Sequence, residues 1–561
     1  MNDIRRTILW VIFGFSMVLL WDAWQVHNGR QATFFPRPDV SAKAAAPAAS
    51  GSAVPPAAAT PAGATAAAGT QVPAQAAPAA PRETIEVQTD VLRLRIDTLG
   101  ATLVEATFPQ HADIVDPAKP FTLMTQSAQH TYVAQTGLVG GNLPNHLSPM
   151  RLVSGERRLA DGQNSLTLRF EGASDSGIKL VKTYTLNRGS YAIEVAHEVS
   201  NSGSAAVAPQ LYLQLVRDNT KPAGESSFYS TFTGPAVYTE AKKYQKVEFD
   251  DIAKNKAEIE RNADNGYVAM VQHYFASAWL LGQGVARENF VRKTDQNLFA
   301  AGMVTPLGEL APGQSRSVKA TLYTGPQEEK RLEALAPGLE LVKDYGWLTM
   351  LAKPLYWLLD KLHGFLGNWG WSIMALVLLL KIAFYWLNAK AYASMAKMKA
   401  VNPRIMEMRE RLKNNPQQMQ MEMMKIYREE KVNPMGGCFP MLVQIPVFIA
   451  LYWVLLSSVE MRNAPWIGWI TDLSAKDPYF ILPVVMTLST LLQTALNPAP
   501  PDPLQAKMMW LMPLMFSVMF FFFPAGLVLY WITNNVLSIA QQWIINTRMG
   551  VPPQFNLPKF K

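Results

Sequence analysis

Apolar and polar residues are segregated along this chain of 561 residues rather than mixed evenly. Long apolar runs are concentrated in the last third. Residues 40–83 consist almost entirely of Ala, Pro, Gly and Thr, and the stretch that follows is polar, with short alternating runs. Because long apolar runs suit a bilayer and low-complexity Ala/Pro stretches suit a tether, the pattern predicts an anchor (1–25), a linker (26–83), a soluble domain (84–335) and a membrane domain (366–548), followed by a short tail (549–561).

The stretch 84–335 alternates with a period of two residues. Its apolar positions recur at every second residue in four separate runs: Leu92, Leu94 and Ile96; Leu166, Leu168 and Phe170; Tyr191, Ile193 and Val195; Leu211, Leu213 and Leu215. Alternation of this kind is typical of strands with one buried face. The sequence therefore predicts an all-β sandwich.

Six apolar runs are candidates for membrane spans. The first, residues 7–24, follows Arg5 and Arg6 and would be roughly 27 Å long as a helix, about one hydrocarbon core. A cleaved signal peptide is the alternative, but bulky Trp21 and Trp24 stand at the end of the run in place of a small-x-small cleavage site, which favours a retained anchor. The five other candidate spans are residues 370–388, 436–458, 478–496, 508–523 and 526–545.

Basic residues indicate the orientation of these spans. The loop 389–435 carries ten Lys and Arg residues against five Glu residues, whereas segment 459–477 has only Arg462 and Lys476. Because loops rich in Lys and Arg stay in the cytoplasm, loop 389–435 is predicted to be cytoplasmic. Six spans then place both termini in the cytoplasm and the soluble domain outside the membrane.

Two shorter helical segments are predicted beside the spans. Residues 336–365 have leucines at helical spacing together with Trp347 and Trp357, as expected of an amphipathic helix lying in the membrane interface; a helix packed on the sandwich is the alternative. Asn402–Pro403 and Asn415–Pro416 each resemble an N-cap followed by proline at the first helical position. They predict two helices that form a cytoplasmic hairpin within 389–435.

Signals for catalysis are weak. The single cysteine, Cys438, permits no intrachain disulfide, the histidines show no metal-ligand spacing, and neither a nucleophile elbow nor a glycine-rich phosphate loop is present. We therefore expect no cofactor, no metal and no enzymatic activity. A hydrolase or sugar-binding site on the sandwich loops remains the alternative, with the spans serving only as an anchor.

Lys381 interrupts the candidate span 370–388, and none of the five C-terminal spans contains Asp or Glu. An isolated lysine in a membrane costs about 2.5–3.5 kcal/mol, so we expect it to lie in a hydrated groove with polar residues from other spans: Gln444, Gln493, Thr533, Asn534, Asn535 and Gln541. The alternative is that its ammonium extends to the lipid phosphates. A solute transporter is a weaker hypothesis, because the halves of the chain show no repeat symmetry.

Several motifs resemble one family in order and spacing. They are Ser394–Met398, Asn402–Pro403, Lys431–Pro440 with Gln444, Pro446 and Phe448, Leu473–Ser474, Asp477–Pro478 and Phe523–Tyr530. They resemble the YidC/Oxa1/Alb3 insertases, and Gly266–Met270 with Tyr274–Phe275 and Trp279 is similar to the large periplasmic domain of Gram-negative members. The resemblance implies a polytopic helical membrane protein with six spans, a five-helix insertase core and a periplasmic β-supersandwich.

The resemblance also implies a function in the bacterial inner membrane. Such a protein inserts, folds and helps assemble membrane proteins, alone or with the Sec translocon. Clients include small subunits of respiratory and ATP synthase complexes. Further implied partners are the ribosome, the signal recognition particle or its receptor, and membrane lipids, with no specific nucleic-acid sequence.

Three groups of site residues follow from the resemblance and from the polar pattern. The hydrophilic groove comprises Lys381, Gln444, Gln493, Trp531, Thr533, Asn534 and Asn535. The client slide comprises Met441, Ile445, Phe448, Leu451, Met512, Met515 and Met519. The hairpin surface comprises Met408, Arg409, Arg411, Met419, Met423 and Tyr427, although these methionines would also suit packing of the hairpin on itself. Family members usually carry Arg at the position of Lys381.

Overall fold

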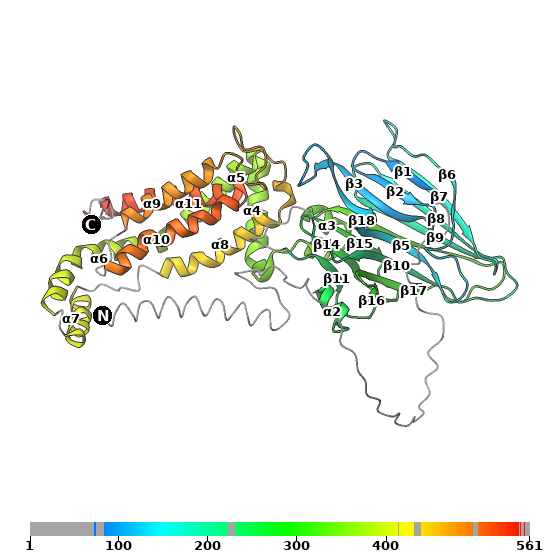
Figure 1. Cartoon of the computed structure of the whole chain (residues 1–561), viewed down its shortest axis with the longest axis horizontal. Coiled ribbons are helices and arrows are strands. Elements are labelled where there is room, and N and C mark those ends of the chain that lie inside the picture. The colour runs from blue at the N-terminus through cyan, green and yellow to red at the C-terminus, as the bar shows by residue number, and fades with distance from the viewer. Residues whose placement is uncertain are drawn as a thin grey trace, which may run out of the picture. The chain divides into compact units, whose positions relative to one another are not determined.

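The computed structural model describes residues 72–73, 83–222, 231–412, 415–430, 439–497, 503–548, 550 and 555. The predicted anchor 1–25, most of the linker 26–83 and most of the tail 549–561 lie outside the described residues. The chain divides into two compact units. The first contains the strands and the second contains the long helices (Figure 1).

The first unit contains two sheets of nine strands each. The strand orders are β1-β2-β3-β4-β5-β10-β17-β16-β13 and β12-β11-β14-β15-β18-β9-β8-β7-β6. The first sheet consists of β1 Thr84–Gln88, β2 Arg93–Asp97, β3 Thr102–Ala112, β4 Pro120–Gln126, β5 Thr131–Val139, β10 Gln210–Asp218, β13 Asn262–Ala263, β16 Arg287–Asp295 and β17 Leu298–Pro306. The second consists of β6 Arg151–Gly155, β7 Ser165–Ala173, β8 Ile178–Asn187, β9 Ala192–Asn201, β11 Gly234–Thr239, β12 Lys243–Lys246, β14 Tyr267–Gln272, β15 Phe275–Leu281 and β18 Ser315–Pro326.

The predicted alternation is confirmed by burial: the twelve apolar residues of the four predicted runs are all buried. Their antiparallel partners place side chains of one face opposite one another, as with Tyr184 and Val195 across β8 and β9. Hydrogen bonds also join the sheets, since Trp279 Nε1 in β15 donates to the carbonyl of Gln214 in β10 at 3.1 Å. Two sheets that bury their apolar faces against each other form a sandwich, as the sequence predicts. The short helices of this unit are α2 Phe249–Ala253 and η1 Leu339–Val342, and α3 Glu329–Leu335 lies almost entirely within it.

Three titratable groups are buried within the sandwich. Lys182 Nζ donates to the carbonyls of Gly100 at 2.6 Å and Thr136 at 2.7 Å. The ring of His197 is hydrogen-bonded to the Thr136 hydroxyl, and the ring of His146 to the Tyr212 hydroxyl. Burial lowers the pKa of Lys182 to about 7. Burial, together with the Lys182 charge, lowers the pKa of His146 to about 4 and that of His197 to about 3.

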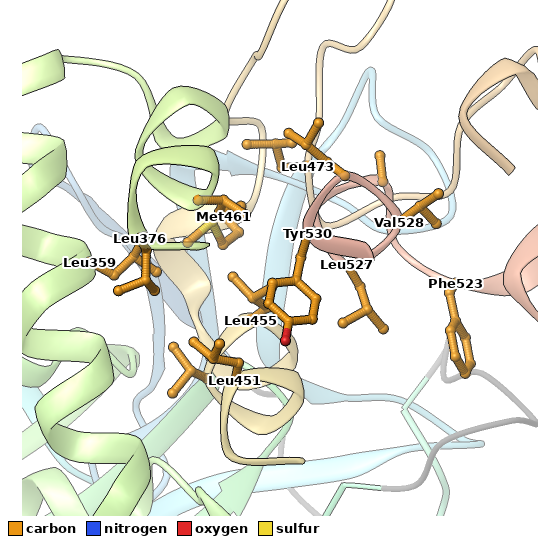
Figure 2. Packing of buried hydrophobic residues seen from close by; sticks show 14 of the residues in the cluster. Leu359, Leu376, Leu451, Leu455, Met461, Leu473, Phe523, Leu527, Val528 and Tyr530 are labelled. Atoms are coloured by element: carbon orange, nitrogen blue, oxygen red, sulfur yellow. The ribbon is translucent and has the colours of Figure 1, made fainter. Parts of the chain in front are cut away.

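The helices of the second unit pack alongside one another (Figure 1). They are α4 Thr349–Leu366, α5 Trp369–Ala383, α6 Tyr385–Arg411, α7 Pro416–Glu429, α8 Phe439–Ser457, α9 Ile481–Leu496, α10 Pro503–Met519 and α11 Ala525–Arg548, with 3-10 turns η2 Gly346–Leu348, η3 Val459–Met461 and η4 Phe520–Phe522. Figure 2 shows their shared core, in which apolar side chains of α4, α5, α8 and α11 meet. Helix α4 therefore buries its inner stripe against other helices of this unit, and it leaves Met350, Trp357 and Phe365 exposed.

Two helices differ from the sequence-based predictions. Helix α6 continues through Asn402–Pro403, where we expected a helix to begin. Pro403 is exposed, and its fixed φ suits a helix; the costs are one backbone hydrogen bond and the crowding of its ring against the carbonyl four residues earlier. The predicted span 370–388 is interrupted at Phe384, where α5 and α6 meet at a bend of 68°. In contrast, α7 begins as predicted, because the Asn415 side chain accepts a hydrogen bond from the Gln418 amide.

Helix length and hydropathy in the described part of the chain give one further result. No single helix there is both long enough and apolar enough to cross a bilayer by itself, whereas the bent pair Trp369–Ala383 and Tyr385–Met398 meets both criteria together.

A buried ionic cluster connects α4 to the turn η3 in the second unit. The side chain of Lys343 is 0% exposed, and its ammonium lies 3.2 Å from both carboxylate oxygens of Glu460 and 4.0 Å from Glu329. The Tyr356 hydroxyl donates to Glu460 at 2.6 Å, and the Tyr345 hydroxyl donates to Glu329. Burial and the adjacent carboxylates raise the pKa of both tyrosines. Such a cluster is stable only while its charges are paired.

Candidate functional site

Lys381 is the centre of the candidate site. It lies in the last turn of α5, and the residue is only 7% exposed. Its ammonium donates a hydrogen bond to Ser538 Oγ in α11 at 2.7 Å, and among the described residues it forms no ion pair. A lysine ammonium has three N–H donors, so this contact leaves donors for water or for another ligand.

Lys381 also lines a small cavity. Its volume is ≈ 20 Å³, room for about one or two water molecules. The lining residues come from α5, α6, α8 and α11 and the bend between α5 and α6: Val377, Leu380, Lys381, Phe384, Leu387, Asn388, Val443, Gln444, Val447, Tyr530 and Asn534. Gln444 Nε2 donates to Asn534 Oδ1 at 2.9 Å, joining α8 to α11. The cavity is thus lined by a lysine and three carboxamide side chains, those of Asn388, Gln444 and Asn534, on otherwise largely apolar walls.

The structure brings three of the seven predicted groove residues together here: Lys381, Gln444 and Asn534. The others lie elsewhere. Asn535 donates to Ser489 at 3.0 Å and to Thr490 at 2.9 Å, so it binds α11 to α9. Thr533 bonds the carbonyl of Leu529 in its own helix, and Gln493 is half-buried on α9 outside the cavity lining.

Trp531, the seventh predicted groove residue, belongs to an aromatic cluster. Its ring centroid lies 4.6 Å from that of Phe448 and 5.1 Å from that of Phe520. It therefore packs between α8 and the turn η4.

Sequence reasoning named Gln541 among the polar residues of the last span, but it did not assign Ser538, Asn388 or Tyr530 to the site. Asn534, Ser538 and Gln541 are separated by four and three residues, which places them on one face of α11. This spacing could have indicated from the sequence that Ser538 and Gln541 share a helix face with Asn534. No sequence pattern pointed to Asn388, because its approach to Gln541 depends on the bend at Phe384.

The predicted client slide divides into exposed and packed residues. Met512, Met515 and Met519 on α10 are exposed, with Met515 at 64%, and Ile445 on α8 is also exposed. Leu451 is buried in the helical core (Figure 2), and Phe448 packs against Tyr530 and Trp531. Met441 lies in α8, and its side chain is outside the described part.

The hairpin methionines named in the prediction pack against each other. Met408 is buried with Val401, Ile405 and Ile426, and the partly buried residues around them include Met419, Met423 and Tyr427. Arg409 is half-buried and Arg411 is exposed. Arg404 adds ion pairs to Glu430 at 2.8 Å and Glu429 at 3.2 Å. The predicted hairpin set thus forms mainly the internal contact between α6 and α7, whereas the exposed methionines among the described hairpin residues are Met406, Met421 and Met424.

Two family models match nearly all of the part of the chain that the structure describes. The model described as YidC periplasmic domain matches residues 84–358, and the model described as 60Kd inner membrane protein matches residues 361–551. The membrane protein insertase YidC of Cupriavidus metallidurans is 55% identical over 98% of both chains, and that of Cupriavidus taiwanensis is 56% identical over 98% of both chains.

The chain belongs to the YidC family. A solved structure titled as an active YidC insertase is also similar, with a TM-score of 0.38 at 18% identity over 82% of this chain and 91% of that chain.

Membership of the YidC family decides the broad questions about the function. The chain is a membrane protein insertase of the inner membrane and not an enzyme. Its β-sandwich is the periplasmic domain, and its helical C-terminal part corresponds to the inner membrane protein model. Its clients are membrane proteins.

Proposed function

We propose that insertion depends on the positive charge of Lys381 at the wall of a hydrophilic groove. The supporting observation is that Lys381 is buried, that its ammonium is bonded to a neutral hydroxyl, and that the residue lines a cavity together with Gln444 and Asn534. An ammonium without a carboxylate partner keeps its attraction for acidic groups. The acidic tail of a client enters from the cytoplasm and is stabilised there, while its apolar segment moves into lipid along Ile445 and the α10 methionines.

The groove is nearly closed in this state. A cavity of ≈ 20 Å³ admits water but not a peptide segment. Entry of a client therefore requires α8 and α11 to separate where Gln444 and Asn534 are hydrogen-bonded. A hydrogen bond between neutral side chains contributes only about 0.5–1.5 kcal/mol net, so it is weak enough to open when a client binds.

Insertion of a small client with an acidic tail tests the role of Lys381. Wild type, Lys381→Arg and Lys381→Ala are purified, shown to be folded, and reconstituted in liposomes at equal density. We expect Arg to keep the initial insertion rate within about threefold, because it keeps the positive charge. Ala should lower the rate about tenfold or more, equivalent to about 1.4 kcal/mol or more, because it removes the attraction for the acidic tail. Equal insertion rates for Lys381→Ala and wild type would contradict this role and would favour the alternative, in which the Lys381 ammonium only extends to the lipid phosphates.

We propose six spans with both termini in the cytoplasm, an N-terminal anchor at 1–25, and a five-helix core within 366–548. The charge difference between loop 389–435 and segment 459–477 supports this topology. Single cysteines introduced in a Cys438→Ser chain test it. A membrane-impermeant thiol reagent should label a cysteine at Asn463 in intact spheroplasts and one at Gln417 only after permeabilisation. Labelling of both sites in intact spheroplasts would contradict the topology.

The proposed partners follow from the insertase function. They are the Sec translocon, the ribosome, the signal recognition particle or its receptor, and membrane lipids. The basic, exposed outer face of α7, with Lys425 and Arg428 beside Met421 and Met424, supports contacts with such partners.

A further inference from the structure

Ser538 occupies a defined place beside the Lys381 ammonium. Its Oγ accepts a hydrogen bond from Lys381 Nζ at 2.7 Å and donates one to the carbonyl of Asn534, one turn earlier in α11, at 2.7 Å. Because a hydroxyl has a single hydrogen and two lone pairs, the bond to Asn534 leaves Ser538 oriented as an acceptor toward Lys381. The residue is buried, so water does not compete freely for this contact.

Gln541, three residues further along α11, holds the backbone at the same point. Its Nε2 donates to the carbonyl of Lys381 at 3.4 Å, and its Oε1 accepts from Asn388 Nδ2 at 3.3 Å. Lys381 precedes the bend at Phe384 and Asn388 follows it. Gln541 therefore connects the two sides of the bend to α11.

We propose that Ser538 and Gln541 are positioning residues that direct the Lys381 ammonium into the cavity. This inference rests on the proposed role of Lys381 in insertion. A lysine near the end of a span has a flexible stem that can carry its ammonium to the membrane surface. Ser538 opposes that movement with a hydrogen bond to a charged donor, and Gln541 fixes the backbone from which the side chain extends.

The chemistry of Ser538 suits this role. A carboxylate at the same place would neutralise the ammonium and end its attraction for acidic client groups. A hydroxyl orients the ammonium and leaves its charge in place. The contact also leaves two N–H donors of Lys381, and the cavity beside them contains Gln444 and Asn534.

The test compares two clients that differ only in their translocated tails, one with Asp and Glu and one with Asn and Gln at the same positions. Full-length wild type, Ser538→Ala and Ser538→Thr are reconstituted in liposomes. We expect Ser538→Ala to lower insertion of the acidic client about five- to tenfold, in line with the loss of one hydrogen bond to a charged group. Insertion of the neutral client should stay within about twofold. Ser538→Thr, which keeps the hydroxyl, should restore the acidic client to within about twofold of wild type.

Ser372→Ala is the matched control. Ser372 is also buried and also bonds the carbonyl four residues earlier, at 2.7 Å to Asn368, but it lies at the opposite end of α5. It should change insertion of neither client. Gln541→Met should give the same selective loss as Ser538→Ala, since it removes the support of the Lys381 backbone.

Lys381→Ala distinguishes failure of this inference from failure of the proposed function. If Lys381→Ala loses the acidic client and Ser538→Ala inserts both clients as wild type does, the positioning role is overturned and the role of Lys381 stands. Equal losses for both clients in Ser538→Ala would also overturn it, because they indicate a structural defect. Wild-type insertion by Lys381→Ala would overturn both proposals together.

Discussion

Replacing Lys343 by Met should destabilise the helical unit by about 3–5 kcal/mol, the usual effect of removing one partner from a buried ion pair. The side chain of Lys343 is fully buried, and the change leaves the carboxylates of Glu460 and Glu329 close together without their cation. The measurement is the denaturant midpoint of the full chain in mixed micelles, combined with amide exchange of peptides from α4 and η3.

Two variants make this prediction specific. Lys361→Met removes an exposed lysine from α4 and should change stability by no more than about 0.5 kcal/mol. Adding Glu460→Gln and Glu329→Gln to Lys343→Met should recover much of the loss, because no unpaired charge then remains buried. A midpoint for Lys343→Met equal to that of wild type would show that the cluster contributes nothing to stability.

Acid should unfold the periplasmic sandwich selectively between pH 6.5 and about pH 4. His146 and His197 have pKa values of about 4 and about 3 in the folded chain, compared with 6.5 when exposed. The unfolded chain therefore binds more protons in this range, and stability present above pH 6.5 is lost as the pH falls. At ~1.4 kcal/mol for each pKa unit, each ring accounts for about 3 kcal/mol or more. Amide exchange of strands β5, β8 and β9 in the full chain, measured against pH, checks this.

His146→Gln combined with His197→Gln should flatten this acid dependence. Lys182 affects the stability of the sandwich in a different pH range. Its pKa is about 7 in the folded chain and 10.5 when exposed, so its contribution makes stability rise between pH 7 and 10.5. Acid sensitivity in the double variant equal to that of wild type would assign the effect to other groups.

The candidate site was predictable only in part. Lys381 stood out in the sequence because it is a charge within an apolar run that has no acidic partner in any C-terminal span. Gln444 and Asn534 were included because they are polar residues in other spans, and the structure places both at the cavity. The same reasoning selected Asn535, which bonds α9 instead. Two adjacent helical residues point about 100° apart, and composition does not say which of them faces the lysine.

Local pattern by itself determined the sandwich, the apolar helices and the start of α7. Period-two burial, long apolar runs and an Asn-Pro cap depend on residues close together in the chain, so a local reading is sufficient. Only tertiary structure decided the bend at Phe384, the continuation of α6 through Pro403, the packing of the hairpin methionines and the contact between Lys381 and Ser538. Each of these depends on a neighbour distant in sequence or on a small balance between a lost backbone hydrogen bond and packing elsewhere, and no local pattern carries that information.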